Sequence, residues 1–267
     1  MTDDVAYVLP RHPAEVDRLD VQHYALREAL GTNHLASVEG PALILDVGSG
    51  TGQWAYDLCA EFPKAVVIGL DLEPSKPGAP ASYRSVRANL LNGLPFVDGG
   101  IDYVHQRFMF AAVPVRSWPG VVADLVRVAR PGGWVELTEG ATELVPAGPA
   151  TERLTEMLRR LSRTRGLDST AMVFGSLDNY LRRAGATEVT RRTVALPLGD
   201  WGGRVGSLMA CDFRALFTRL SPAFMSAFGV PEAECWVLVR SALEECDQQQ
   251  STYSVAVAYG RRPHAVA

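Results

Sequence analysis

A glycine-rich turn between a short apolar run and a helical stripe constrains this chain more than any other feature. Residues 43–47 are apolar except for Asp46, and the next five residues carry glycine at every second position, Gly48, Gly50 and Gly52. Apolar residues then recur at helical spacing. A turn stripped of side chains lets a ligand approach the backbone, and the helix that follows offers free N–H groups. The pattern predicts a strand–turn–helix unit with a ligand at its turn.

Short apolar runs and helical stripes alternate through the first half of the chain. We expect strands at 43–47, 65–70, 83–88, 101–105 and 134–138, helices near 54–62 and 118–129, and a turn at 131–133. Strands that are apolar on both faces and alternate with helices are typical of a parallel sheet covered on both sides. Right-handed crossovers then give a doubly wound α/β fold.

Helices flank this unit on both sides. A helical pattern begins at Pro13 and stops near Gly31, after an irregular tail over residues 1–12. In the second half, we predict helices at 151–166, 175–185, 208–220 and 231–247, with strands at 187–196 and 251–259.

Composition and charge exclude several classes of protein. The net charge of −4 argues against a large basic face for nucleic acid. The four cysteines form no Cys-x-x-Cys pair and have no histidine at zinc spacing, so we expect free thiols and no metal site. The acidic N-terminus lacks the apolar segment of a signal peptide, and no apolar run approaches the roughly 20 residues that span a bilayer. We expect a cytoplasmic protein with no membrane partner.

The glycine spacing differs from that of a dinucleotide-binding turn. Gly52 comes one residue earlier than the third glycine of that fingerprint, and position 53 is Gln. Asp46, just ahead of the first glycine, would repel a pyrophosphate but can accept a hydrogen bond from an amine. Asp71 ends the second strand, where an acid can bind both ribose hydroxyls of an adenosine. The alternative is that Asp71 only caps a turn.

Taken in order along the chain, these segments resemble the class I S-adenosylmethionine-dependent methyltransferases. The resemblance covers residues 43–139 through DVGSGTG, GLDLEP, RANLLNGLPF, IDYVHQR and RPGGWVEL. The segments RLDVQH, EFPKAVVIGLDLEP and VALPLGDW are similar to a narrower group, the methyltransferases related to a fungal regulator of secondary metabolism, which has bacterial relatives. This resemblance implies a Rossmann-like, mostly parallel seven-stranded sheet with a helical cap.

The resemblance also implies a division of the chain and a set of cofactor contacts. Residues 1–42 would form a helical cap, 43–140 the cofactor-binding core, and 141–267 the rest of the sheet with a helical insertion for the acceptor. The glycine turn would hold the methionine moiety of S-adenosylmethionine, Asp71 the ribose, and the next segments the adenine. The residues expected at the cofactor are Arg18, Gln22, Asp46, Gly48, Ser49, Gly50, Gly52, Asp71, Leu72, Asn89, Leu90, His105 and Gln106.

The acceptor side is less defined by the sequence. His105 ends the fourth strand and is the candidate general base, although it could also only orient the cofactor or pack beneath it. Arg18 and Gln22 share one face of the first helix, which could close over the cofactor carboxylate or the acceptor, or lie at the surface. The residues expected to line the acceptor pocket, each also compatible with an ordinary core position, are His23, Met172, Phe174, Trp201, Met209 and Phe213.

The sequence therefore predicts an enzyme that transfers a methyl group to a small molecule, one expected from secondary metabolism. Two alternatives stay open: a catalytically silent S-adenosylmethionine-binding regulator, and an NAD-dependent oxidoreductase, which the glycine spacing disfavours. The sequence does not determine the acceptor or the oligomeric state, so that a homodimer remains an alternative.

Overall fold

The computed structural model describes residues 13–73 and 75–264, with side chains from residue 17 onward, so the tail expected over residues 1–12 lies outside the described residues. The helices are α1 (Pro13–Leu30), α2 (Gln53–Glu61), α3 (Trp118–Val128), α4 (Pro149–Thr164), α5 (Met172–Arg183), α6 (Gly203–Phe228) and α7 (Glu232–Gln248). The strands are β1 (Leu43–Val47), β2 (Val66–Asp71), β3 (Tyr83–Arg87), β4 (Ile101–Arg107), β5 (Ala129–Val145), β6 (Thr187–Pro197) and β7 (Thr252–Arg261). Short 3₁₀ turns are η1 (Leu90–Asn92), η2 (Met109–Ala111), η3 (Val115–Ser117) and η4 (Asp200–Gly202).

The strands form one seven-stranded sheet, and this confirms the predicted fold class. Its order is β3-β2-β1-β4-β5-β7-β6. The neighbours from β3 to β5 are parallel, and β7 runs antiparallel to both β5 and β6. The carboxyl ends of β1, β2 and β4 therefore meet at one edge, where a doubly wound sheet binds its ligands.

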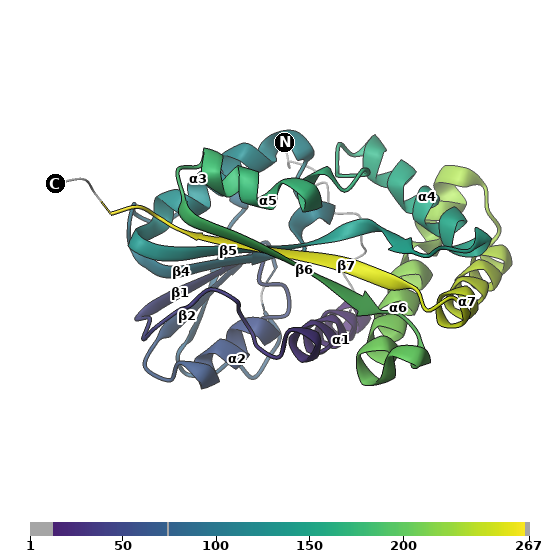
Figure 1. Ribbon diagram of the computed structural model, residues 1–267, viewed down its shortest axis with the longest axis horizontal. Coiled ribbons are helices and arrows are strands. Elements are labelled where there is room, and N and C mark those ends of the chain that lie inside the picture. Colours follow the sequence, from purple (N-terminus) through teal and green to yellow (C-terminus); the bar gives the residue numbers. More distant parts are fainter. Residues whose placement is uncertain (1–12, 74, 265–267) are drawn as a thin grey trace.

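Helices cover both faces of the sheet, with α2 on one side and α3 and α5 on the other (Figure 1). Successive side chains of β1 point to opposite faces. Ile44 packs with Trp54 and Leu58 of α2, whereas Leu45 belongs to the cluster that contains Leu125 of α3. Burial on both faces explains why the first strands read as continuous apolar runs.

A helical cap packs on the far ends of the long strands β5, β6 and β7. It is formed by α1, α4, α6 and α7 and has its own apolar cluster (Figure 1). Helix α6 runs through Pro222 and is longer than the predicted segment 208–220. The division expected at residue 140 falls inside β5, so the core and the cap share strands.

Two further features complete the fold. The turn expected at 131–133 lies inside β5 and appears as an irregularity in the register between β4 and β5, with Gly132 at a φ of 74°. The fifth strand therefore begins at Ala129 rather than at the predicted Trp134, and residues 131–133 form an irregular segment within it. Among the described residues, no helix is long and apolar enough to cross a membrane.

Candidate active site

The glycine turn joins β1 to α2 at the carboxyl edge of the sheet. Gly48 and Gly50 have φ values of 73° and 53°, which glycine adopts without strain. The backbone N–H groups of Gly48 and Ser49 donate to the Leu70 carbonyl at 2.8 and 3.1 Å. The turn is thereby tied to the end of β2, the strand that carries Asp71.

Asp71 lies directly beside this turn. Its Oδ2 accepts a hydrogen bond from the Gly50 N–H at 2.9 Å, and its Oδ1 accepts one from the Glu73 N–H at 3.1 Å. Burial raises the pKa of the Asp71 carboxyl. The structure thus places Asp71, the acid predicted to bind the ribose, beside the glycine turn predicted to hold the methionine moiety.

The residues expected around the adenine follow the next strand. Leu72 comes directly after β2, while Asn89 and Leu90 start η1 after β3. The Ala88 N–H donates to the Asp71 carbonyl at 3.0 Å, which holds the ends of β2 and β3 together. The Asn89 side-chain oxygen caps η1 by accepting from the Leu91 N–H at 3.0 Å.

Two apolar side chains lie against the turn, whose backbone the sequence predicted to be open to a ligand. A Cβ atom built on Gly48 would be 2.3 Å from the Met109 sulfur, and one on Gly50 would be 3.3 Å from a methyl of Leu19. The bare backbone is therefore in contact with flexible groups rather than with rigid structure. Leu19 and Met109 must move for a ligand to reach the turn.

Gln106 gives an independent indication of a ligand at this edge. Its side chain is fully buried at the end of β4, next to Val47 of β1 and Leu137 of β5 in register. Neither its Nε2 nor its Oε1 has a hydrogen-bond partner within the described residues. A buried amide without partners is unfavourable, and a ligand with complementary polar groups would relieve the penalty.

The candidate base, His105, lies beneath the site rather than in it. Its ring stacks on Trp54 with a centroid distance of 3.7 Å, and its Nδ1 is 2.8 Å from Asp46 Oδ1. Burial lowers the pKa of His105, and its side chain is 2% exposed. An acceptor cannot reach this ring, so we infer that His105 orients Asp46 and do not propose it as the base.

Arg18 and Gln22 face α6 instead of the glycine turn. Arg18 donates to Asp212 at 2.6 Å, and Gln22 donates to the other oxygen of the same carboxylate at 3.2 Å. Both residues line the pocket described below. This arrangement favours the acceptor, rather than the cofactor carboxylate, as the ligand that this face of α1 contacts.

His23, expected in the acceptor pocket, is buried between α1 and α2. Its Nε2 is 3.0 Å from Asp57, and the Arg107 guanidinium donates to its Nδ1 at 3.2 Å. Burial also lowers the pKa of His23. A neutral ring that donates to Asp57 and accepts from Arg107 has a structural role here.

A pocket of about 140 Å³ lies between α1, α4, α6, the loop after β4 and the end of β5. Met209 and Phe213 line it, as expected. Phe174 instead packs against the core under α3 and α5, and the exposed side chains of Met172 and Trp201 lie on α5 and η4. We therefore keep only Met209 and Phe213 as acceptor-pocket residues.

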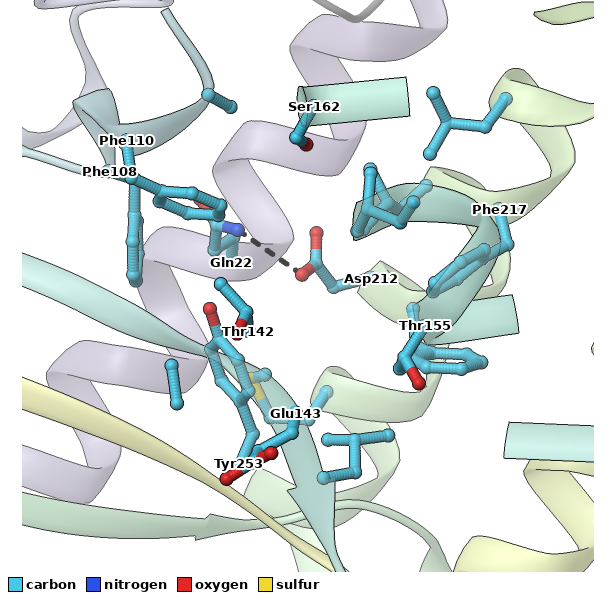
Figure 2. A pocket seen from close by; sticks show the side chains of 18 of the residues that line it. Gln22, Phe108, Phe110, Thr142, Glu143, Thr155, Ser162, Asp212, Phe217 and Tyr253 are labelled. Carbon is cyan, nitrogen blue, oxygen red and sulfur yellow. Dashed lines mark hydrogen bonds between the residues drawn. The ribbon is translucent and has the colours of Figure 1, made fainter. Parts of the chain in front are cut away.

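Other pocket residues were missed from the sequence. Figure 2 shows Phe108 and Phe110 on one side of the pocket and Phe217 on the other, with Asp212 between them. Asp212 interrupts the apolar stripe of α6, and such an acid on an apolar face is a signal that could have identified it. The phenylalanines gave no such signal, because aromatic residues occur equally in cores.

The loop after β4 connects the pocket to the glycine turn. Phe108, with a φ of 53°, and Phe110 line the pocket, while Met109 between them lies against Gly48. Glu139 of β5 accepts hydrogen bonds from the N–H groups of Met109 and Phe110 at 2.7 and 3.1 Å. Leu19 likewise lines the pocket and touches Gly50, so the two sites share a thin wall of side chains.

Comparison with known proteins also indicates a methyltransferase. Residues 44–133 match the family model described as a methyltransferase domain. The chain is 28% identical over 225 residues to the methyltransferase pytC of Aspergillus terreus, a match over 78% of this chain and 67% of that protein. It is also 28% identical over 211 residues to the secondary metabolism regulator laeA of Aspergillus fumisynnematus, over 73% of this chain and 54% of that protein.

Among solved structures, the fold is similar to phosphoethanolamine N-methyltransferase 2 of Haemonchus contortus in its complex with phosphomonomethylethanolamine and S-adenosylhomocysteine. The TM-score is 0.55 at 16% identity, over 92% of this chain and 58% of that one. This likeness bears on the fold, and the sequence matches bear on the activity. Together they show a methyltransferase domain at residues 44–133, in a chain similar to curated methyltransferases and with a fold shared by a solved methyltransferase.

Proposed function

We propose that this enzyme methylates a small molecule held in the pocket between α1, α4, α6 and the end of β5. The observation that carries the proposal is the shared wall: Leu19 and the loop around Met109 each touch the glycine turn and belong to the pocket or its lining segment. A methyl donor at the turn and an acceptor in the pocket would then be neighbours.

The cofactor contacts in this proposal follow the geometry of the edge. Asp46 and the turn from Gly48 to Gly52 would hold the aminoacyl part, and Asp71 the ribose hydroxyls. Leu72, Asn89 and Leu90 would lie at the adenine, and the unpartnered amide of Gln106 would hydrogen-bond to the cofactor. When bound, S-adenosylmethionine supplies an electrophilic methyl group whose leaving group is a neutral thioether.

The protein's contribution to the reaction is alignment and exclusion of water. Apolar side chains around the pocket keep solvent from the reacting atoms, and α1 and α6 fix the acceptor through the Arg18–Asp212 pair. Alignment of two reactants in this way supplies on the order of 7–11 kcal/mol of the barrier reduction. A neutral leaving group needs no general acid, and the burial of His105 leaves no assigned base.

We favour an acceptor from secondary metabolism, because one relative is connected with secondary metabolism by its name. The laeA relative is named as a regulator of secondary metabolism, and pytC as a methyltransferase. The same regulator supports the second candidate function, a protein that binds the cofactor without turning over a small molecule.

Titration calorimetry and an acceptor screen test these proposals. We expect S-adenosylhomocysteine to bind and NADH not to bind. We also expect S-adenosylhomocysteine to be released when S-adenosylmethionine is supplied with an extract of small metabolites from the native host. Cofactor binding without product from any small-molecule fraction would favour the regulatory function, whereas NADH binding would favour an oxidoreductase.

A further inference from the structure

The pocket beside the glycine turn has features that indicate which kind of acceptor it binds. This inference rests on the proposed function. We propose that the acceptor is an uncharged molecule that places one six-membered ring in the pocket and donates an O–H or N–H hydrogen bond to Asp212. Size, wall chemistry, charge and the position of Asp212 each support one part of this description.

The size of the pocket matches a single ring. Its volume is about 140 Å³, and an engineered apolar protein cavity of about 150 Å³ binds benzene. A fused two-ring system is larger than this volume, and removal of a wall residue would make room for it. Leu216 is the wall residue best suited for such a test, because it is only partly buried and its loss would spare the core.

The wall chemistry matches an apolar or aromatic ring. Phe108 and Phe110 line one side, and Phe213 and Phe217 of α6 line another. The rings of Phe213 and Phe217 lie 4.5 Å apart, which fixes that side of the pocket. Aromatic walls of this kind favour an inserted ring over a flexible polar chain.

The charges around the pocket disfavour an anionic acceptor. Two arginines line it, and both are paired: Arg18 with Asp212 at 2.6 Å, and Arg159 with Glu143 at 2.9 Å. A third carboxylate, Asp168, also belongs to the lining. An entering carboxylate would therefore meet more negative than positive charge in a poorly hydrated space, which is costly.

Asp212 provides the polar end of the pocket. The Asp212 side chain is 7% exposed, and Arg18 donates to one of its carboxylate oxygens and Gln22 to the other. In Figure 2 the Asp212 carboxylate, the Gln22 amide and the Tyr253 ring converge on the same space. Each carboxylate oxygen accepts more than one hydrogen bond, so that a ligand donor can join those already present.

Tyr253 adds a polar group without adding charge. Burial and the neighbouring carboxylates of Glu139 and Asp212 raise the pKa of its phenol, so the group stays protonated. The pocket therefore presents a carboxylate acceptor and a neutral phenol to a ligand. This combination suits a neutral hydroxyl or amine on an otherwise apolar ring.

Ligand-observed NMR with three probes tests the proposal on the protein saturated with S-adenosylhomocysteine. The probes are phenol, benzoate and 1-naphthol at neutral pH. We expect phenol to bind, and both benzoate and 1-naphthol to bind at least about tenfold more weakly, because one carries an unmatched charge and the other exceeds the space. Benzoate or 1-naphthol binding as tightly as phenol would overturn the proposal.

Variants place the probe in this pocket. Leu216→Trp should abolish phenol binding, and Leu216→Ala should bring 1-naphthol to at least the affinity of phenol. Asp212→Asn should weaken phenol binding by about fivefold or more, the loss of a charge-assisted hydrogen bond. Met172→Ala, on the exposed surface of α5, is the control and should change nothing. Phenol binding that is insensitive to both Leu216 variants would overturn the proposal even if Asp212→Asn does not fold.

The same experiment separates this inference from the proposed function. A protein that binds S-adenosylhomocysteine but not phenol keeps the proposed function and loses the ring-sized acceptor. A protein that does not bind S-adenosylhomocysteine loses the proposed function, whatever phenol does.

Discussion

Replacement of Gln106 by leucine should raise the stability of the ligand-free protein and weaken its binding of the cofactor. The Gln106 side chain is fully buried, and neither of its polar atoms has a partner within the described residues. Leaving buried polar groups unpaired costs roughly 1–3 kcal/mol. Leucine has a similar shape and can pack against Val47 and Leu137. The substitution therefore removes the cost of the unpaired amide and keeps the packing.

The expected magnitudes follow from this penalty. The free energy of unfolding without ligand should rise by about 1–3 kcal/mol. The dissociation constant of S-adenosylhomocysteine should rise by about 5- to 150-fold, the same range expressed as an equilibrium constant. Urea unfolding followed by circular dichroism measures the first change, and titration calorimetry measures the second.

A matched variant controls for the effect of removing any glutamine. Gln53 donates to Asp57 Oδ1 at 2.8 Å, so Gln53→Leu breaks a made hydrogen bond and should lower the free energy of unfolding. If Gln106→Leu also lowers stability and leaves the cofactor affinity unchanged, the reasoning is refuted, since Gln106 would then be satisfied without a ligand.

Three further substitutions test the same edge of the sheet. Asp71→Ala should weaken S-adenosylhomocysteine binding by at least about 1–2 kcal/mol through lost charge-assisted hydrogen bonds, and an unchanged dissociation constant in calorimetry would contradict the ribose role. Gly50→Val should abolish binding while the protein stays folded by circular dichroism, because the residue has a φ of 53° beside Leu19. Glu139 has a pKa raised to about 8 by burial, so its contribution to stability is full below about 4.5 and is lost as pH rises through about 8. Glu139→Gln should flatten this decline in urea midpoints measured from pH 5 to 9, and an unchanged slope would assign the decline to other groups.

The sequence predicted the sheet well, because its strands carry strong local signals. The run at 43–47 and the stripe after it fold as β1 and α2 almost to the residue. The start of β5 was missed, since Pro131 and two glycines are typical of a turn. In the structure Ala129 pairs with Ile101 of β4, and Gly132 and Gly133 exchange backbone hydrogen bonds with Arg262. Tertiary pairing overrides local preference at such a position.

The site was predictable only where function leaves a local pattern. The glycine turn and Asp71 were found because their spacing itself encodes the geometry, and the structure brings them within hydrogen-bond distance. The pocket was not, because its walls come from α1, α4, α6 and the loop after β4, which no sequence period links. Met172 and Trp201 have the same apolar character as Phe213 but lie at the surface.

A crystal structure with S-adenosylhomocysteine tests the central claim most directly. We predict the aminoacyl part against residues 48–52, the ribose hydroxyls within hydrogen-bond distance of the Asp71 carboxylate, and the Met109 side chain turned away from Gly48. A ligand bound elsewhere, with Met109 still packed on the glycine turn, would contradict the account.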